Sequence, residues 1–430
     1  MSSILPLPRG GEGRGEGVKP WKVGLLATLY FAQGLPFGFQ SNALPLYLTE
    51  LGLTMTEVSL ARALALPWAL KALWAPLVDR YGSARFGRRK SWIVPMQLLL
   101  ATTCVIASLF PLSRETLTPV LICVLLMNLF AATQDIAVDG LAVDLLSNRE
   151  LGLGNAAQVV GYKIGILTGG GLLVALFAKG DWNSLFLSMA ALCLAVMTLV
   201  FFVKERATQE TSTERVTVTW KELAARIRVL LSRPGVRWLL VGVATYKMGE
   251  TLADAMFGAW MVRVHHLPKE QVALWLGSWG MIASLAGSFL GGVVATRLAL
   301  KRAVLVTGAL RLIPLIAQWA VVAGFALPTA STIVPLTCAE HFFGGMLTTS
   351  MFALMMSSVD WRIGATHYTL LASVEVIGKA APGILSGVLV DAVGFQPVFA
   401  ASVLLSLLFL AVVPKLPDHF ETQDERPGLG

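Results

Sequence analysis

Long apolar runs separated by short polar loops dominate this chain of 430 residues, and they constrain its fold more than any other feature. A helix needs about 20 apolar residues to cross a bilayer core of about 30 Å. Charged residues make up only 14% of the chain, against about 25% in soluble domains, which leaves little room for a soluble domain. The sequence therefore predicts an all-α membrane protein with twelve transmembrane helices, at about 21–48, 57–78, 91–110, 119–146, 153–177, 183–203, 236–263, 270–296, 303–326, 329–357, 363–390 and 396–414.

Polar segments divide the twelve runs into two groups of six. Residues 1–20 are rich in Gly, Arg and Glu, cannot bury a core and are predicted to be disordered. Residues 204–235 are the only long polar stretch between two runs, and they are predicted to hold an amphipathic surface helix. The expected domains are thus an N-terminal six-helix half at 21–203, a C-terminal half at 236–414 and a tail at 415–430. Two pseudo-symmetric halves joined by a linker are the plan of a transporter whose site lies between the halves.

Lys and Arg concentrate in alternate loops, which predicts the orientation of the chain. The loops after the second, fourth, sixth and eighth runs carry most of them, whereas the opposite loops hold little beyond Arg114, Lys179 and Lys269. Because positive residues are retained on the cytoplasmic side, both termini are predicted to be cytoplasmic. The net charge of +8 has the same origin. It therefore does not indicate nucleic-acid binding, and the lipid bilayer is the expected large partner.

The fourth run carries ionisable residues at bilayer depth. Asn128, Asp135 and Asp139 are spaced i, i+7 and i+11 and share one helical face, with Gln134 beside them. A carboxylate in the middle of a membrane costs roughly 2.5–3.5 kcal/mol on insertion scales, so such residues usually mark a pathway or a proton relay. Asp135 and Asp139 are therefore the predicted proton carriers.

Lys163 in the fifth run is the predicted counter-charge of this acidic pair. Counting equal distances from the turn between the fourth and fifth runs places Lys163 at the depth of Asp135 and Asp139. One lysine against two acids leaves an excess carboxylate that is available for a proton. A purely structural ion pair is the alternative.

The second half repeats this arrangement, with an acid-bearing run followed by a lysine-bearing run. The same counting places Lys379 in the eleventh run opposite His341, next to Glu340. Glu375 and Lys379 are also spaced i, i+4, so a pair within one helix is the competing explanation.

Polar residues of the first and seventh runs are predicted to line the substrate cavity, because the first span of each half faces the cavity in a two-half transporter. Their side chains offer hydrogen bonds to hydroxyls, amides and carboxylates. Polar contacts that only hold helices together are the alternative for each residue. The predicted lining set, with members from other runs, is Gln33, Gln40, Asn128, Gln134, Lys247, Glu250, Asp254, Glu340 and Lys379.

An ordered pattern of charges and glycine follows the second run. Asp79-Arg80 is followed by Gly87-Arg88-Arg89. The pattern resembles the cytoplasmic loop signature of the major facilitator superfamily, and the resemblance implies a cytoplasmic latch. In that latch Asp79 pairs with arginine and helps to hold the two halves closed, with Arg80, Arg88 and Arg89 as the candidate partners. A loop that is merely positive would need neither the acid nor the ordered glycine.

Longer stretches resemble the AmpG muropeptide permeases, a group related to the acetyl-CoA transporter family. They are spread from the first to the tenth run, at Tyr30–Gly38, Leu70–Arg80, Ala132–Asp139, Gly161–Gly165, Tyr246–Glu250 and Gly344–Thr349. The resemblance implies proton-driven import of anhydro-muropeptides for cell-wall recycling, across the inner membrane of a bacterium.

The sequence thus favours a secondary active transporter that works by alternating access, with a muropeptide and protons as its small-molecule partners. The alternatives are uniport, transport of acetyl-CoA-like or small amphiphilic solutes, and a non-transporting receptor. The chain shows no phosphate-binding loop, no nucleophile elbow and no metal-ligand spacing. We therefore expect no enzyme activity, no cofactor and no metal site, and we expect a monomer.

Overall fold

Helices make up the described part of the computed structural model, which covers residues 20–51, 53, 61–83, 86–111, 113–147, 149–177, 182–202, 235–268, 271–272, 274–359 and 363–417. These residues contain no strand, only a lone β-bridge between Ser83 and Gly87. Seven of their helices are by themselves long and apolar enough to cross a membrane. The predicted all-α membrane fold is confirmed.

Three predicted segments fall wholly or largely outside the described residues. They are the disordered segment at 1–20, the linker at 204–235 with its amphipathic helix, and most of the tail at 415–430. The domain boundaries therefore stay predictions.

The N-terminal half contains a first span that includes one π-helical turn and a second span that is broken into short pieces. The remaining spans are regular, except for a second π-helical turn at a run of three glycines in the fifth. The elements are α1 (Pro20–Gly38), η1 (Phe39–Ala43), α2 (Leu44–Glu50), η2 (Ala61–Ala65), α4 (Leu66–Leu70), η3 (Lys71–Leu73), α5 (Ala75–Arg80), α6 (Lys90–Ser108), α7 (Leu117–Leu145), α8 (Leu151–Leu167), η4 (Thr168–Leu172), α9 (Leu173–Leu176) and α10 (Trp182–Phe202).

Two prolines break the second span. Pro67 and Pro76 each lie at the first or second position of a short helix, and Trp74 between those helices leaves the helical region at φ −113° and ψ 0°. Proline lacks the N–H that would continue the preceding helix, and its ring clashes with the preceding turn. The break produces the 3-10 turn η3, which carries Lys71.

The C-terminal half is more regular, apart from a break in its first span at Tyr246 and Lys247 and a π-helical segment at the start of its second. Its elements are α12 (Val236–Thr245), α13 (Met248–His265), η5 (Leu274–Trp279), α15 (Gly280–Arg297), α16 (Leu300–Val322), α17 (Ala330–Ser357), α18 (Gly364–Val393), α19 (Phe395–Val412) and η7 (Val413–Lys415).

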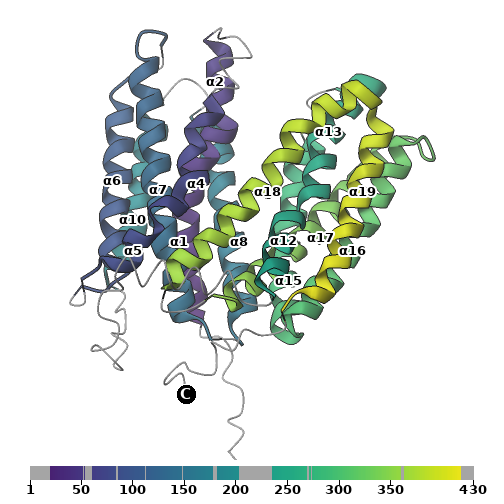
Figure 1. Ribbon diagram of the computed structural model, residues 1–430. Helices are drawn as coiled ribbons and strands as arrows, with labels where there is room; N and C mark the ends of the chain where they lie inside the picture. The colour runs from purple at the N-terminus through teal and green to yellow at the C-terminus, as the bar shows by residue number, and fades with distance from the viewer. Residues whose placement is uncertain are drawn as a thin grey trace, which may run out of the picture.

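The buried cores show where the two halves meet. One hydrophobic cluster contains residues of both halves, such as Ile136 and Leu141 together with Met355 and Tyr368. Further clusters belong to a single half, one around Phe186 in the N-terminal half and others in the C-terminal half. Figure 1 shows the same division, because the halves meet at the end of the bundle where α5 and α15 lie and diverge at the end of α2 and α13. We call the first end the closed end and the second the open end.

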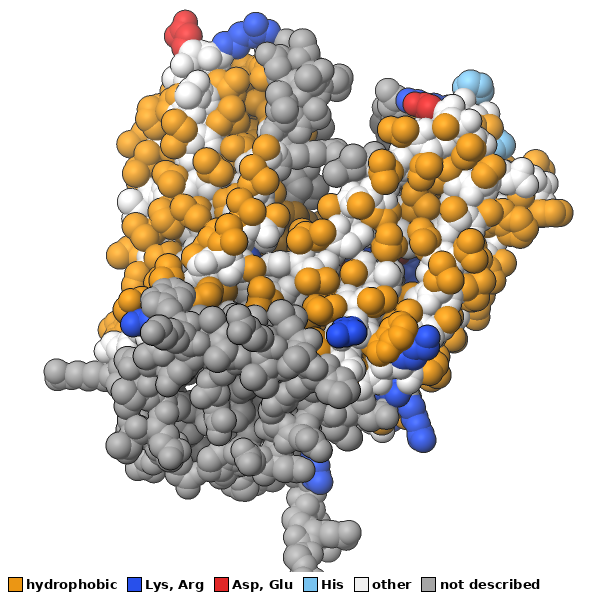
Figure 2. All heavy atoms as spheres, viewed as in Figure 1, with side chains coloured by type: hydrophobic (Ala, Val, Ile, Leu, Met, Phe, Trp, Pro, Cys, Tyr) orange, Lys and Arg blue, Asp and Glu red, His pale blue; other side chains and the backbone are white. Residues whose placement is uncertain are grey.

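A hollow separates the halves at the open end. Figure 2 shows it as a deep notch between the N-terminal half and the C-terminal half, whose visible surfaces are largely apolar. On the face seen in Figure 2, the described residues of both halves present mostly hydrophobic side chains, as a lipid-facing surface requires. Among the described residues, the halves are in contact at the closed end and apart at the open end.

Candidate transport site

The acidic pair of the fourth span lies against a lysine from the broken second span. Asp135 and Asp139 on α7 are 6% and 1% exposed. Lys71 on η3 forms an ion pair with Asp135 and places its Nζ 3.7 Å from Oδ2 of Asp139. Two carboxylates thus share one ammonium group, and all three side chains are removed from water. Burial without a partner would cost each of these charges several kcal/mol, so the pairing is what makes the cluster tolerable.

Hydroxyl and amide groups complete the surroundings of Asp139. The Tyr30 hydroxyl on α1 donates to Oδ1 of Asp139 at 2.6 Å, and Nε2 of Gln158 on α8 donates to the same oxygen at 3.4 Å. We call Lys71, Asp135, Asp139, Tyr30 and Gln158 the N-terminal cluster. It holds one more carboxylate than it holds ammonium groups.

The prediction that Lys163 neutralises this pair is wrong. Lys163 donates instead to the hydroxyls of Ser284 and Ser288 on α15, the latter at 3.1 Å. No carboxylate of the described residues lies within ion-pair distance of Lys163. Depth counting gives a height along the helix but not the direction in which a side chain points, and Lys163 points across the interface to the other half.

Lys71 is the partner of the acidic pair, and the sequence did not predict this. A lysine close to the expected end of a span usually extends its ammonium group to the membrane surface, so Lys71 was not expected to pair with buried acids. It is 4% exposed. Two signals could have found it. Lys71 lies nine residues before Arg80, about 13 Å along a helix and well inside the bilayer. Pro76 follows five residues later and breaks the helix next to it.

The C-terminal half holds a second charged group centred on Arg311 of α16. Arg311 is 2% exposed and forms an ion pair with Glu340 of α17. Its Nε lies 3.6 Å from Oε2 of Glu250, and Nζ of Lys247 lies 3.8 Å from Oε1 of Glu250. A lone arginine inside an apolar span is itself a signal of an intramembrane site, and the sequence prediction overlooked it.

Three carboxylates of this half converge. Ligand atoms of Glu250, Asp254 and Glu340 lie within 4.8 Å of one another, although the sequence shows no metal-ligand spacing. His341 also pairs with Glu340. We call Lys247, Glu250, Asp254, Arg311, Glu340 and His341 the C-terminal cluster. Because two permanent cations already lie among the three acids, the group matches a proton or an ammonium group better than a divalent metal.

Lys379 does not meet Glu340 or His341, so that part of the predicted repeat is also wrong. Nζ of Lys379 lies 3.0 Å from Glu375 on the same helix, which is the competing i, i+4 pair. The Tyr246 hydroxyl donates to Glu375 as well, at 3.3 Å.

The residues predicted to line the cavity divide into buried and accessible ones. Gln33, Asn128 and Gln134 are fully buried, and Gln40 and Glu340 are 4% and 1% exposed, so none of these side chains lines an open cavity in this structure. Asn128 accepts a hydrogen bond from the Trp68 indole at 2.9 Å, whereas both amide atoms of Gln33 and of Gln134 have no partner among the described residues. The other predicted lining side chains are partly or largely exposed to solvent, namely Lys247, Glu250, Asp254 and Lys379.

Three aromatic rings from α1, α4 and α8 gather near the N-terminal cluster. Phe37, Trp68 and Tyr162 are mutual neighbours, with ring centroids 5.9–6.1 Å apart. Each ring is half-buried, and Nζ of Lys71 lies 5.8 Å from the Trp68 ring. The group offers apolar ring surface beside the charges.

Asp79 ties the two halves together at the closed end. Its Oδ1 accepts from Nη1 of Arg89 at 2.8 Å, while its Oδ2 accepts from the backbone N–H of Thr366 on α18 at 2.7 Å. Arg89 is fully buried and also donates to Asp144 at 2.9 Å. Asp144, which lay outside the predicted polar stripe, thus belongs to this group. A side chain at Gly140 would collide with the Arg89 guanidinium.

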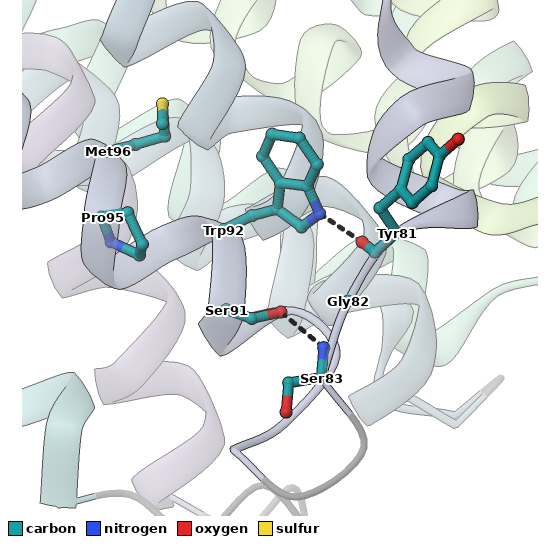
Figure 3. Close-up of a pocket in the computed structure, with 7 residues that line it drawn as sticks. All are labelled: Tyr81, Gly82, Ser83, Ser91, Trp92, Pro95 and Met96. Atoms are coloured by element: carbon teal, nitrogen blue, oxygen red, sulfur yellow. Dashed lines mark hydrogen bonds between the residues drawn. The ribbon is translucent and has the colours of Figure 1, made fainter.

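The other predicted latch arginines have different surroundings. Arg88 lies 3.5 Å from Oδ1 of Asp79 and donates to the backbone oxygen of Asp79. The Arg80 guanidinium lies 5.5 Å from the ring centroid of Tyr81. Figure 3 shows the loop that follows, where the Trp92 indole donates to the backbone of Tyr81 beside a surface hollow of about 320 Å³.

A further ion pair closes the turn between α7 and α8. Lys22 donates to Glu150 at 2.7 Å and to the Leu145 carbonyl at 2.8 Å. Burial acts to raise the pKa of Glu150, but hydrogen bonds from Lys22 and Ser147 outweigh it and hold that pKa below its ordinary value. The closed end is thus fastened within the N-terminal half as well as between the halves.

Two packed halves with charged clusters near their interface define the major facilitator superfamily fold. The same fold is found in the crystal structure of the transporter FucP in the outward conformation, with a TM-score of 0.66, 14% identity and coverage of 91% of this chain and 96% of that one. The family model described as acetyl-coenzyme A transporter 1 matches residues 22–206.

Within that superfamily the chain belongs to the AmpG-like permeases. It is 29% identical to the anhydromuropeptide permease of Escherichia coli strain K12 over 387 residues, which cover 88% of this chain and 76% of the relative. It is 31% identical over 390 residues to a Haemophilus influenzae protein named only as uncharacterized, with 88% and 90% covered. The chain is therefore an integral, multi-pass membrane transporter and not an enzyme, as predicted.

Proposed function

We propose that this transporter imports muropeptides together with protons by alternating access. The observation that carries the proposal is the N-terminal cluster, where two buried carboxylates share one ammonium group. The excess carboxylate is stable in a membrane when it holds a proton, and it is destabilised when it is ionised. Asp135 and Asp139 form the proton site, with Lys71 in the role first assigned to Lys163.

The substrate proposal rests on the accessible residues and on the relative's name. The E. coli relative is named an anhydromuropeptide permease. A muropeptide combines sugar rings with a peptide that carries carboxylates and an amine. The aromatic group at Phe37, Trp68 and Tyr162 suits the apolar faces of sugar rings. The accessible charges Lys247, Glu250 and Asp254 suit the peptide.

The orientation follows from the loop charges. Because Arg and Lys concentrate in the loops of the closed end, we place that end and both termini in the cytoplasm, in the inner membrane of a bacterium. Asp79, Arg88 and Arg89 are then the cytoplasmic latch, and the open end receives substrate from outside. The protein acts as a monomer, since its site lies between two halves of one chain.

The test is uptake of labelled anhydro-muropeptide into proteoliposomes with and without an inward-directed proton gradient. We expect concentrative uptake only with the gradient. Asp135→Asn and Asp139→Asn should abolish accumulation, while Glu115→Gln, outside the acidic clusters, serves as a matched loss of one carboxylate. Uptake that ignores the gradient would establish uniport instead.

The family model described as acetyl-coenzyme A transporter 1, which matches residues 22–206, suggests acetyl-CoA-like solutes as a second substrate class. Acetyl-CoA carries several phosphates, so its binding would require an excess of cations, whereas each cluster holds more carboxylates than permanent cations. Competition of labelled muropeptide uptake by acetyl-CoA tests this directly. Strong competition would favour the acetyl-CoA-like alternative, and failure of both compounds to be transported would favour a receptor.

A further inference from the structure

A hydrogen-bonded chain runs from the proposed proton site across the interface between the halves. Oδ1 of Asp139 accepts from Nε2 of Gln158 at 3.4 Å. Oε1 of Gln158 in turn accepts from the hydroxyl of Tyr368 at 3.3 Å. Asp139 and Gln158 belong to α7 and α8 of the N-terminal half, whereas Tyr368 belongs to α18 of the C-terminal half. Tyr368 and Asp139 are each 1% exposed and Gln158 is 8% exposed.

Tyr368 lies close to the closed-end contact. It follows Thr366 by two residues, and the Thr366 N–H is the group that Asp79 holds. The chain of hydrogen bonds therefore ends on the first turn of α18, which is the segment that must leave the N-terminal half before the closed end can open.

The direction of the hydrogen bonds between Asp139, Gln158 and Tyr368 depends on the charge of Asp139. An ionised carboxylate only accepts hydrogen bonds, so Gln158 must turn its NH2 group to Asp139 and its carbonyl to Tyr368. A protonated Asp139 is a donor, and the carbonyl of Gln158 becomes its best partner. Rotation of the amide then presents NH2 to Tyr368, and the hydroxyl loses the acceptor to which it now donates.

We propose that Gln158 is a positioning residue that couples protonation of Asp139 to separation of the two halves at the closed end. The proposal rests on the proposed proton symport and deepens it. Ionised Asp139 keeps Gln158 oriented to accept from Tyr368, which holds α18 against the N-terminal half. Protonated Asp139 turns the NH2 group of Gln158 towards Tyr368, so the buried Tyr368 hydroxyl loses its acceptor, the contact weakens and opening is favoured.

Other groups around Asp139 act on the same equilibrium. Asp135 lies one turn away on α7, Lys71 approaches from η3, and Tyr30 donates from α1. From α18, Tyr368 and Glu375 are the facing ionisable groups, since Glu375 interacts electrostatically with both Lys71 and Tyr368. Gln158 differs from all of them because it is not ionisable and touches both halves.

The experiment measures opening of the closed end directly. Spin labels replace Arg149, in the turn just before α8, and Arg302, in the first turn of α16, in a background without the four native cysteines. Distances between the labels are recorded in proteoliposomes at about pH 5 and about pH 8, so that the proton concentration differs about a thousandfold between the two samples. We expect the long-distance population of the otherwise unaltered protein to rise about five- to tenfold at the lower pH, the size of shift that one hydrogen bond supports.

Gln158→Leu and Tyr368→Phe should each make this population insensitive to pH, with gradient-driven accumulation reduced about fivefold or more and exchange between internal and external substrate retained. Tyr246→Phe is the matched control, because its hydroxyl donates to Glu375 within one half. It should keep the pH response. Tyr368→Phe is nearly isosteric, so it tests the proposal even where Gln158→Leu does not fold.

The outcomes distinguish failure of the role proposed for Gln158 from failure of the proposed proton symport. A normal pH response in folded Gln158→Leu or in Tyr368→Phe overturns the role of Gln158 while leaving symport intact. Absence of both a pH response and gradient-driven uptake in the unaltered protein overturns the proposed symport itself. A pH response that survives Asp139→Asn overturns Asp139 as the group that Gln158 senses.

Discussion

The N-terminal cluster holds two carboxylates against one lysine, whereas the C-terminal cluster holds three carboxylates against an arginine and a lysine. Each therefore has one carboxylate in excess of its permanent cations. They differ in their access to the hollow, since Asp139 is sealed under Tyr30 and Gln158 while Asp254 is exposed.

This difference indicates that the two halves of one fold can serve proton coupling and solute binding separately. A sealed carboxylate exchanges a proton but excludes a solute, so the N-terminal cluster suits coupling. An accessible cluster of mixed charge suits a solute with both an amine and a carboxylate. The four predictions below, from the largest expected effect to the smallest, test this assignment.

Removing Arg311 should have the largest effect. Arg311→Leu leaves Glu340 buried beside two other acids with only Lys247 and His341 to compensate, and it should destabilise the protein by about 3–5 kcal/mol. Thermal unfolding in detergent measures this. Arg311→Leu combined with Glu340→Leu should recover most of the loss, because both partners of the buried ion pair are removed and the cluster keeps its original excess of one carboxylate. A double variant no more stable than the single one would show that Arg311 contributes through packing.

Removing Lys71 should be less costly and should depend on pH. Lys71→Met leaves two carboxylates without an ammonium group, but protons can neutralise them. We expect a loss of roughly 2 kcal/mol at neutral pH that shrinks as the pH falls, since protonation removes the unpaired charges. Melting curves at several pH values measure this. A loss that is equal at all pH values would contradict the assignment of Lys71 as counter-charge.

Lys163→Met should have a smaller effect on stability, about 1 kcal/mol, because the partners of Lys163 among the described residues are two serine hydroxyls of the other half. It separates the two candidate cations of the N-terminal half in the same melting assay. A pH-dependent loss as large as that of Lys71→Met would restore Lys163 as the partner of the acids.

Gln134→Leu should have the smallest effect and the opposite sign. Both amide atoms of Gln134 are buried without a partner in the part of the chain that the structure describes, so replacing the amide with an apolar side chain of similar size should be neutral or raise stability by about 1 kcal/mol. Gln158→Leu, which breaks two hydrogen bonds, is the matched comparison in the same half. A clear loss of stability in Gln134→Leu would reveal a partner for that amide, such as bound water.

The span positions were largely predictable, and the partners were not. Hydropathy placed α6, α7 and α10 to within a few residues, because apolar length is a local property of the chain. Spacing also identified Asp135 and Asp139 as neighbours on one face. It could not select Lys71 over Lys163, since that choice depends on the proline break in the second span and on the rotation of α8 against its neighbours.

At the closed end, too, part of the contact could be predicted from the sequence and part could not. The resemblance to the major facilitator loop signature implied that Asp79 pairs with an arginine of this loop, but it did not select Arg89, and the Thr366 N–H and Asp144 come from helices distant in sequence. Sequence separation of 287 residues between Asp79 and Thr366 leaves no local signal.

The sequence by itself determined that this protein is a bundle of membrane-spanning helices with acids in its interior, because each helix satisfies its own backbone and its apolar length must match the bilayer. Only the tertiary structure decided which cation meets each acid and which contacts cross between the halves. The physical reason is that an ion pair forms over a few ångströms and needs a defined direction, which helix packing and helix breaks set after the spans have formed.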